Sequence, residues 1–264
     1  MHTKKLRTCA LGLTTTDGHN KLVARGFATA PPSGTGQMII TVRVVRSGKV
    51  LLEGHFGGVL ALLYGSIFVD GPMKNLILLT TPIDFRELKL FANFADRRYF
   101  DVDRLIDAAG NMPPEMILSS FELLRPASRV AGQLQLWENI WNDEYVKSYR
   151  MFDRWATDTL PLAGEYFRCI TKDLMWDNKL FNGTMSVGER PAHLANIKVP
   201  VLHAVAEHDH IVPYDSAKHL IAMVGSADKE EVTLKGGHVS LVAGANAIKR
   251  LWPKLDSWLC RRST

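Results

Sequence analysis

A buried strand, a glycine-rich turn, an apolar helix and a second buried strand follow one another between residues 50 and 80. Residues 50–52 predict the first strand, and the turn after it consists of Gly54, His55, Phe56, Gly57 and Gly58. The apolar residues 59–64 predict a helix, and residues 75–80 predict the second strand. Two strands joined by a helical crossover run parallel in one sheet. The sequence therefore predicts an α/β fold with a mostly parallel sheet.

Two further predicted strands near the C-terminus each lead into a loop with a polar residue. Residues 199–205 predict a buried strand followed by Asp209, and residues 231–234 predict another, followed by His238 on a glycine-rich loop. Polar residues just past the carboxyl ends of parallel strands meet at one sheet edge, where α/β proteins build their sites. In nucleophilic acyl transfer an Asp orients the His that acts as base. Asp209 and His238 are therefore candidate catalytic residues.

The nucleophile of such a site precedes the acid and the base in the chain and stands on a sharp strand-to-helix turn. Residues 54–58 lie at such a turn, between a predicted strand and an apolar helix. The nucleophile is usually a Ser or a Cys whose proton the His removes, and the turn contains neither. Its position favours a degenerate nucleophile elbow over a plain tight turn.

The strand pattern stops between about residues 87 and 190, where large apolar residues recur at helical spacing. Helices are predicted over residues 130–141, 145–155 and 163–176. We interpret this segment as a helical cap inserted into one domain, residues 1–264, whose core consists of residues 38–86 and 191–264. The aromatic side chains of the cap are interpreted as core residues.

The last predicted helix has an apolar stripe that is expected to face the core. The stripe consists of Ala245, Ile248, Leu251, Trp252, Leu255, Trp258 and Leu259.

Charge and cysteine content restrict the classes of partner and compartment. The net charge of +5 suits a phosphorylated substrate or an anionic surface, but scattered basic residues account for it more simply. No cluster of Lys and Arg is interleaved with aromatics, so we expect the chain to bind no nucleic acid.

The longest apolar run, residues 57–69, is shorter than the ~20 residues of a membrane-spanning helix, so we expect no integral membrane segment. Three well-separated Cys argue against a disulfide framework and favour the cytoplasm.

Two other kinds of site fit the sequence less well. His203, His208 and His210 suggest a metal site, but no nearby carboxylate and His have a familiar ligand spacing. Cys169 offers a thiol in the cap, yet its apolar neighbours favour a buried structural Cys. We therefore expect neither a metal nor a bound cofactor.

Several segments in a fixed order carry a resemblance to a known family. They are residues 75–85, residues 177–180 with Gly183, residues 196–202, residues 206–213 and residues 236–238. Together they resemble the catalytic domain of poly(3-hydroxyalkanoate) synthases, from about Gly57 to the C-terminus and including residues 101–126 of the cap.

The resemblance implies an α/β-hydrolase core with a helical cap and a Cys-His-Asp triad. In that family a thiolate takes the acyl group from 3-hydroxyacyl-CoA and passes it to a growing polyester. By position, Asp209 would orient the base and His238 would be the base. The CoA thioester would be a substrate, with no separate cofactor. The resemblance also implies a homodimer or a synthase partner subunit, and a place in the cytoplasm at the surface of polyester granules.

The chain departs from this family at the elbow, where the family has Cys in a Gly-x-Cys-x-Gly-Gly turn. Alignment on Gly54 puts Phe56 at the Cys position, and alignment on the double glycine puts His55 there. Residues 1–49 also lack a match to the family, so a disrupted reading frame before Gly57 is one hypothesis. Three functions remain open: a synthase-like acyltransferase, an inactive homologue that binds acyl-CoA, polyester or a synthase subunit, and an esterase that acts through water or His55.

Overall fold

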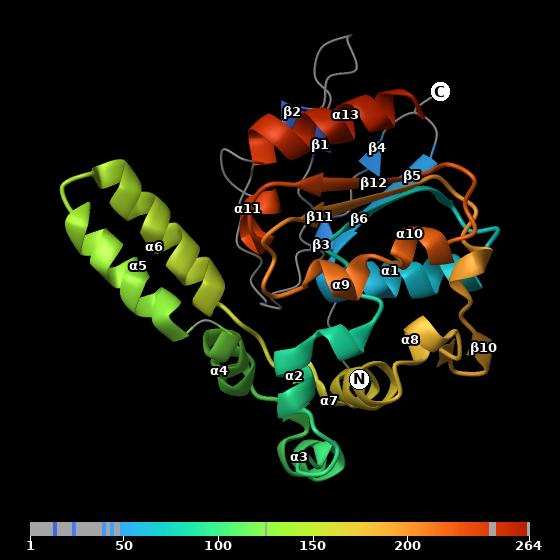
Figure 1. Ribbon diagram of the computed structural model, residues 1–264, viewed down its shortest axis with the longest axis horizontal. Coiled ribbons are helices and arrows are strands. Elements are labelled where there is room, and N and C mark those ends of the chain that lie inside the picture. The colour runs from blue at the N-terminus through green and yellow to red at the C-terminus, as the bar shows by residue number, and fades with distance from the viewer. Residues whose placement is uncertain are drawn as a thin grey trace, which may run out of the picture.

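The computed structural model describes residues 13–14, 23–24, 39–40, 43–44, 48–124, 126–242 and 247–262. Its centre is a six-stranded sheet (Figure 1). The strands, in spatial order, are β12 (Lys229–Leu234), β11 (Val201–Ala206), β6 (Met73–Leu79), β5 (Gly48–Gly54) and β3 (Ile39–Ile40), with β4 (Arg43–Val44) also paired to β5. Neighbouring strands from β5 to β12 are parallel, while β3 and β4 run antiparallel to β5. The predicted α/β fold with a mostly parallel sheet is thus confirmed.

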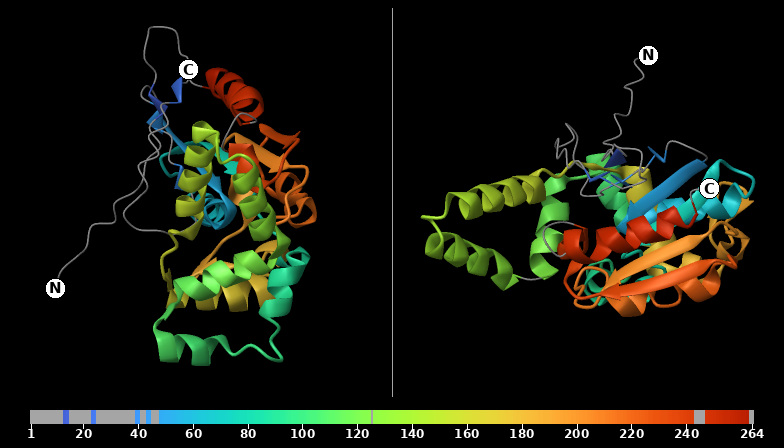
Figure 2. Two further views of the ribbon diagram at one scale, coloured as in Figure 1. Left: turned by 90° about the vertical axis from the view of Figure 1, so that its left-hand side faces the viewer. Right: turned by 90° about the horizontal axis from the view of Figure 1, so that it is seen from above.

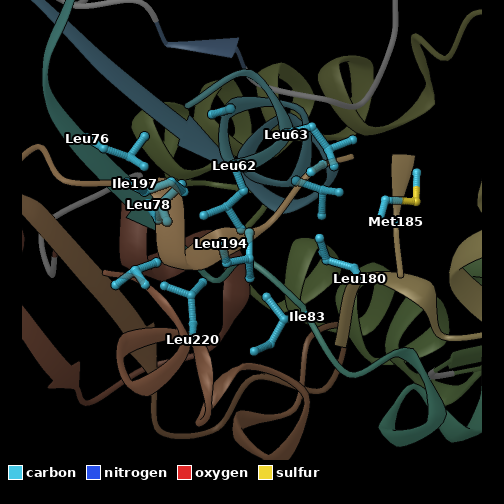
Figure 3. Close-up of a cluster of buried hydrophobic side chains, with 14 of the residues drawn as sticks. Leu62, Leu63, Leu76, Leu78, Ile83, Leu180, Met185, Leu194, Ile197 and Leu220 are labelled. Atoms are coloured by element: carbon cyan, nitrogen blue, oxygen red, sulfur yellow. The ribbon is translucent and has the colours of Figure 1, made fainter. Parts of the chain in front are cut away.

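Helices cover both faces of the sheet, which explains why its central strands, β6 and β11, are mostly apolar and buried. Helix α1 (His55–Ile67) lies on one face and α13 (Trp252–Cys260) on the other (Figure 1). Because side chains alternate along a strand, β6 contributes to two cores. Leu76 and Leu78 belong to the cluster that contains Leu62 of α1, shown in Figure 3. Ile77 belongs to the cluster that contains Trp258 of α13.

The register of the sheet sets the edge at which a site can form. Gly54 of β5 pairs with Leu79 of β6, and Leu79 pairs with Ala204 of β11. The carboxyl ends of these strands therefore lie at the same level. Helices α9 (Tyr214–Ala217), α10 (Leu220–Met223) and α11 (His238–Val242), with η3 (Leu194–Asn196), complete the core region.

The segment between β6 and β11 is mostly helical. Its elements are η1 (Phe85–Glu87), α2 (Lys89–Phe94), α3 (Val102–Ala109), α4 (Pro114–Leu124), α5 (Pro126–Glu138), α6 (Asp143–Thr157), α7 (Gly164–Cys169), η2 (Ile170–Trp176) and α8 (Lys179–Asn182). Two small strand pairs accompany them, β7 (Asn111–Met112) with β8 (Leu162–Ala163) and β9 (Ser186–Val187) with β10 (Arg190–Pro191). Helices α5 and α6 form a hairpin that projects from the rest of the molecule (Figures 1 and 2). The division into core and cap stays a prediction.

A buried hydrogen-bond network fastens the end of this segment to the turn after β6. The side chain of Asn178 donates to Asp84 Oδ1 (2.9 Å) and accepts from the backbone N–H of Phe85 (3.0 Å). Asn178 is left-handed, with φ of 48°, a conformation that Asn tolerates better than most residues. The guanidinium of Arg86 donates to the Asp84 carboxylate, and this hydrogen bond is the main reason why the pKa of Asp84 lies below its ordinary value.

Three expectations from periodicity are wrong in detail. The helix predicted over residues 130–141 ends at Glu138, and Trp137 and Trp141 are 73% and 77% exposed rather than in a core. Ile248 is 66% exposed, although the stripe of the last helix was expected to face inward. Residues Ala247–Leu251 form a π-helix, η4, whose wider turn shifts the α-helical phase of the stripe. Ala245, the first residue of that stripe, lies outside the described residues.

Candidate active site

The loops that follow β11 and β12 lie side by side, because the ladder between the strands continues beyond them. The N–H of Glu207 donates to Leu234 O (2.9 Å), and the N–H of His208 donates to Gly236 O (3.0 Å). These two bonds fix one loop against the other immediately before Asp209 and His238.

Asp209 and His238 are brought together at this edge. His238 Nδ1 lies 2.5 Å from Asp209 Oδ2, and both residues are buried. The other oxygen, Oδ1, accepts the backbone N–H groups of Ile211 (2.9 Å) and Val212 (2.8 Å), which hold the carboxylate in place. Since a carboxylate accepts, Nδ1 carries the proton that it donates, and Nε2 is the nitrogen that can take up a second proton. This is the connectivity that a general base needs.

Ser240, which the sequence did not indicate, shapes the loop before His238. Its Oγ accepts from the N–H of Gly237 (2.8 Å) and donates to Gly237 O (2.9 Å). Gly236 has φ of 139°, and a Cβ there would lie 2.5 Å from Ser240 Oγ. The position therefore requires glycine. A Ser shortly after a glycine pair, at the start of a short helix, was the available signal for this turn.

The strand-to-helix junction of the predicted elbow falls between Gly54 and His55. Strand β5 ends at Gly54 and α1 begins at His55; the side chain of His55 lies outside what the structure describes. Phe56 is half-buried against the main core, with its ring centroid 6.0 Å from that of Phe85. Gly58 brings α1 close to the loop after β6, since a Cβ there would lie 2.0 Å from Thr81 Oγ1. Residue 55 is thus the first residue after the strand, and the side chain of Phe56 packs against the main core.

Thr80, directly after β6, has a backbone conformation that sequence reasoning did not anticipate. It is buried and has φ of 44°, in the left-handed region that a β-branched residue rarely adopts. Its N–H donates to Ala204 O (2.8 Å), which holds the turn against β11. Such strain costs about 1–3 kcal/mol and persists where the surroundings over-determine it, often at functional sites.

A mostly apolar cleft of about 240 Å³ lies beside the loop that carries Asp209. Its walls come from η1 and α2, from the end of α4, and from the loop after β11. The lining includes the apolar side chains Leu88, Leu90, Phe91, Leu124, Ile211 and Pro213, together with Glu87, Lys89, His210 and Asp215. The cleft thus lies between the helical segment and the loop after β11, and neither Asp209 nor His238 lines it.

The three His residues considered for a metal site do not gather. His203 is fully buried, with Nδ1 3.0 Å from Glu231 Oε2, whereas His208 and His210 are exposed. The Tyr214 hydroxyl also donates to Glu231 (2.8 Å). Burial alone would raise the pKa of Glu231, but the hydrogen bonds from His203 and Tyr214 bring this pKa below its ordinary value. Among the described residues, no group of three or more His, Cys, Asp or Glu has the arrangement of a metal site.

Cys169 is half-buried, and burial raises the pKa of its thiol to about 11. A thiol with this pKa is protonated near neutral pH and is a poor nucleophile. Cys260 also has a raised pKa, with burial again the main cause, and Cys9 lies outside the described residues. In the part of the chain that the structure describes, no helix is both long and apolar enough to cross a bilayer.

Sequence comparison finds several relatives, although no protein-family model matches the chain. The "Poly(3-hydroxyalkanoate) polymerase subunit PhaC" of Thiocystis violacea is 32% identical over 210 residues, which are 78% of this chain and 58% of that protein. The proteins of the same description from Haloferax mediterranei and Synechocystis sp. are 27% and 28% identical, over 83% and 85% of this chain and 45% and 61% of theirs. The chain thus spans about half the length of these relatives.

Solved structures with a similar chain path include a monoacylglycerol lipase of Paleococcus ferrophilus. It is 14% identical with a TM-score of 0.46, and the match covers 82% of this chain and 69% of that one.

The sequence matches extend over about four-fifths of the chain. The chain is therefore related by descent to the poly(3-hydroxyalkanoate) polymerase family.

Proposed function

We propose that this chain is a domain of the poly(3-hydroxyalkanoate) polymerase type that keeps the base and the orienting carboxylate of an acyl-transfer site for 3-hydroxyacyl-CoA and polyester. His238 is its general base and Asp209 the carboxylate that orients the base. The observation that carries the proposal is the buried 2.5 Å contact between His238 Nδ1 and Asp209 Oδ2 at the sheet edge. The names of the relatives supply the substrate class.

The position of each group assigns its part in the transfer. His238 Nε2 takes the proton of a nucleophile at residue 55, and the nucleophile attacks the thioester carbonyl of the acyl-CoA. The protonated imidazole then returns the proton to the departing CoA sulfur. The backbone N–H of Phe56, the residue after the nucleophile position, is the natural donor to the oxyanion. In a second transfer, His238 Nε2 takes the proton from the hydroxyl of the next hydroxyacyl group, and the hydroxyl oxygen attacks the carbonyl of the acyl-enzyme. The bond between the acyl group and the nucleophile breaks, and the nucleophile regains the proton from His238.

Residue 55 is His rather than Cys, and this favours the inactive-homologue form of the proposal. An imidazole attacked in this way gives an acyl-imidazole, which water hydrolyses readily, so the acyl group is lost before chain extension. Loss of the nucleophile from a triad enzyme costs about 10⁶-fold in turnover. We infer that this chain binds acyl-CoA or polyester, or supports an active partner subunit, without extending a polymer itself.

The decisive experiment restores a thiol at the junction. CoA release from 3-hydroxybutyryl-CoA is measured for the unaltered chain, for His55→Cys and for the matched control Phe56→Cys. We expect release only from His55→Cys, and we expect the further change His238→Ala to abolish it. Release by Phe56→Cys but not by His55→Cys would contradict the assignment of the junction. Polymer formation by the unaltered chain would contradict the inactive form.

An esterase remains the second candidate, supported by the cleft between α2 and the loop after β11, whose lining contains six apolar residues. Hydrolysis of a short-chain ester by the unaltered chain, lost in both His55→Ala and His238→Ala, would favour it. Retention of tight CoA-thioester binding without any hydrolysis would favour the inactive homologue. The granule surface in the cytoplasm and a synthase partner subunit stay predictions of the family relationship.

A further inference from the structure

Strand β11 contains one polar side chain, His203, in an otherwise apolar and fully buried run. Because side chains alternate along a strand, His203 faces the same side as Val201, the face that α1, α9 and α10 cover (Figure 1). Its Nδ1 lies 3.0 Å from Glu231 Oε2, whereas Nε2 is buried without a hydrogen-bond partner among the described residues. A buried polar atom without a partner costs free energy, so stability alone does not explain this His.

Glu231 connects this buried His to the loop that carries Asp209. His203 and Glu231 stand opposite each other in the register between β11 and β12. The second oxygen of the carboxylate, Glu231 Oε1, accepts from the hydroxyl of Tyr214 (2.8 Å). Tyr214 is the first residue of α9, at the far end of the loop that leaves β11 after Ala206. One carboxylate therefore holds the end of this loop against the sheet.

The loop between β11 and α9 is held at both ends. Its first residues continue the ladder toward the loop after β12, as described above. Its far end is held by the side chain of Tyr214 and by Ser216, whose carbonyl accepts two N–H groups from the turn after β6. The N–H groups that fix Asp209 Oδ1 belong to residues 211 and 212, close to this far end. A displacement of Tyr214 is thus expected to reach the Asp209 carboxylate.

We propose that Glu231 is a positioning residue for the pair of Asp209 and His238, and that it acts through Tyr214. Glu231 stands on β12, the strand that leads to His238, while its carboxylate holds the loop that carries Asp209. It therefore links the elements that bear the two members of the pair. The inference rests on the proposed function, in which this pair is the base and its orienting carboxylate. A displacement of a catalytic group by about 1 Å can lower turnover by about 100-fold.

The test begins with Tyr214→Phe, which removes only the hydroxyl that Glu231 accepts from. The measurement is the exchange with water of the proton between His238 and Asp209, observed as a far-downfield NMR resonance of the unaltered chain and each variant. We expect exchange about 10-fold faster in Tyr214→Phe, the factor for loss of one hydrogen bond to a charged group. Glu231→Leu should accelerate the exchange at least as much.

Two controls separate positioning from stability. Val232→Ala truncates the next side chain of β12, which is 8% exposed in the core on the opposite face, and should lower the melting temperature without changing the exchange. Tyr64→Phe removes a phenol hydroxyl near the carboxyl end of α1, on a side chain 37% exposed against 43% for Tyr214. It should change neither quantity. Because Tyr214→Phe alters only one partly exposed hydroxyl, it keeps the test valid even if Glu231→Leu fails to fold.

Turnover separates this inference from the proposed function. In a His55→Cys background, Tyr214→Phe should lower kcat for CoA release from 3-hydroxybutyryl-CoA by about 10-fold and leave KM unchanged. Faster proton exchange in Tyr214→Phe, with no CoA release from His55→Cys, would contradict the proposed function and support the positioning role. Unchanged exchange in Tyr214→Phe, or an equal acceleration by Val232→Ala, would overturn the positioning role.

Discussion

Helices α1 and α5 both contain 13 residues, yet they meet opposite environments. In α1, Val59 and Leu62 are 1% and 0% exposed, because the sheet and the segments that return across it cover the helix. In α5, Val130 and Leu134 are more than half exposed, because the contacts of this helix with α4 and α6 leave these side chains uncovered. The contrast shows that an apolar helix face in the sequence does not by itself reveal whether other elements of the chain cover that face.

The candidate site and helices α5 and α6 also differ in how firmly the rest of the chain holds them. Asp209 and His238 are positioned by backbone bonds between adjacent loops of one sheet edge. Helices α5 and α6 contribute no buried side chain among their described residues. Changes at the sheet should therefore cost more folding stability than changes in α5 and α6.

The largest expected effect compares one Leu in each helix. Leu62→Ala leaves a cavity in the main core and should lower the free energy of unfolding by about 2–5 kcal/mol. Leu134→Ala should change the free energy of unfolding by less than about 0.5 kcal/mol, since the side chain of Leu134 is 59% exposed. Urea unfolding followed by circular dichroism measures both. Similar losses for the two variants would break the comparison.

A pair of glycines should give effects of opposite sign. Gly58→Ala places a methyl group 2.0 Å from Thr81 Oγ1 and should destabilise the chain by about 1–3 kcal/mol through overpacking. Gly132→Ala meets Tyr149 only at ordinary contact distance, 3.6 Å, and should stabilise α5 by about 0.5–1 kcal/mol. Thermal unfolding of both variants checks the signs. A neutral Gly58→Ala would show that α1 can move on the sheet.

The Asp84 network should make the attachment of the helical segment sensitive to acid. The pKa of Asp84 is lowered in the folded chain, mainly by the hydrogen bond from Arg86. Its contribution to stability is therefore present above the unfolded value of 3.8 and is lost as pH falls through the lower folded value. Asp84→Asn should cost about 1.5 kcal/mol at pH 7 and progressively less below about pH 4. The same cost at every pH in urea titrations would contradict this.

The smallest expected effect concerns Ser240. Ser240→Ala removes both hydrogen bonds to Gly237 and should cost about 1 kcal/mol. It should also weaken the far-downfield NMR resonance of the proton between His238 and Asp209, because the turn before His238 loosens. The control is Ser120→Ala in α4, which removes the hydroxyl that donates to Ile117 O (2.7 Å) and should leave that resonance unchanged. An unchanged resonance in Ser240→Ala would show that Ser240 does not position the His.

Much of the sheet and the candidate pair could be predicted because they depend on local pattern. Strands β6 and β11 are apolar runs of expected length, β12 is apolar only in its second half, and Asp209 and His238 follow β11 and β12 at the edge that parallel strands share. The junction residue could not be chosen from the sequence, since Gly54 and the double glycine give different alignments. The end of β5 and the packing of Phe56 were needed to assign it.

The features that sequence reasoning missed depend on contacts between distant segments or on unusual backbone. Asn178 and Asp84 form a hydrogen bond although they are 94 positions apart in the chain, and no local sequence pattern predicts such a pair. The positive φ of Thr80 is imposed by its neighbours against the preference of a β-branched residue. Trp137 and Trp141 were assigned to a core because periodicity reveals an apolar face and not its distance from other elements.

The close packing of Gly58, in α1, against Thr81 has a consequence for protein engineering. Because a methyl group at Gly58 would collide with Thr81 Oγ1, we expect the first turn of α1 to keep its place on the sheet when residue 55 is changed. Substitutions at residue 55 should therefore share one Cα position. A saturation library at that single codon would compare side-chain chemistries directly, free of differences in backbone placement.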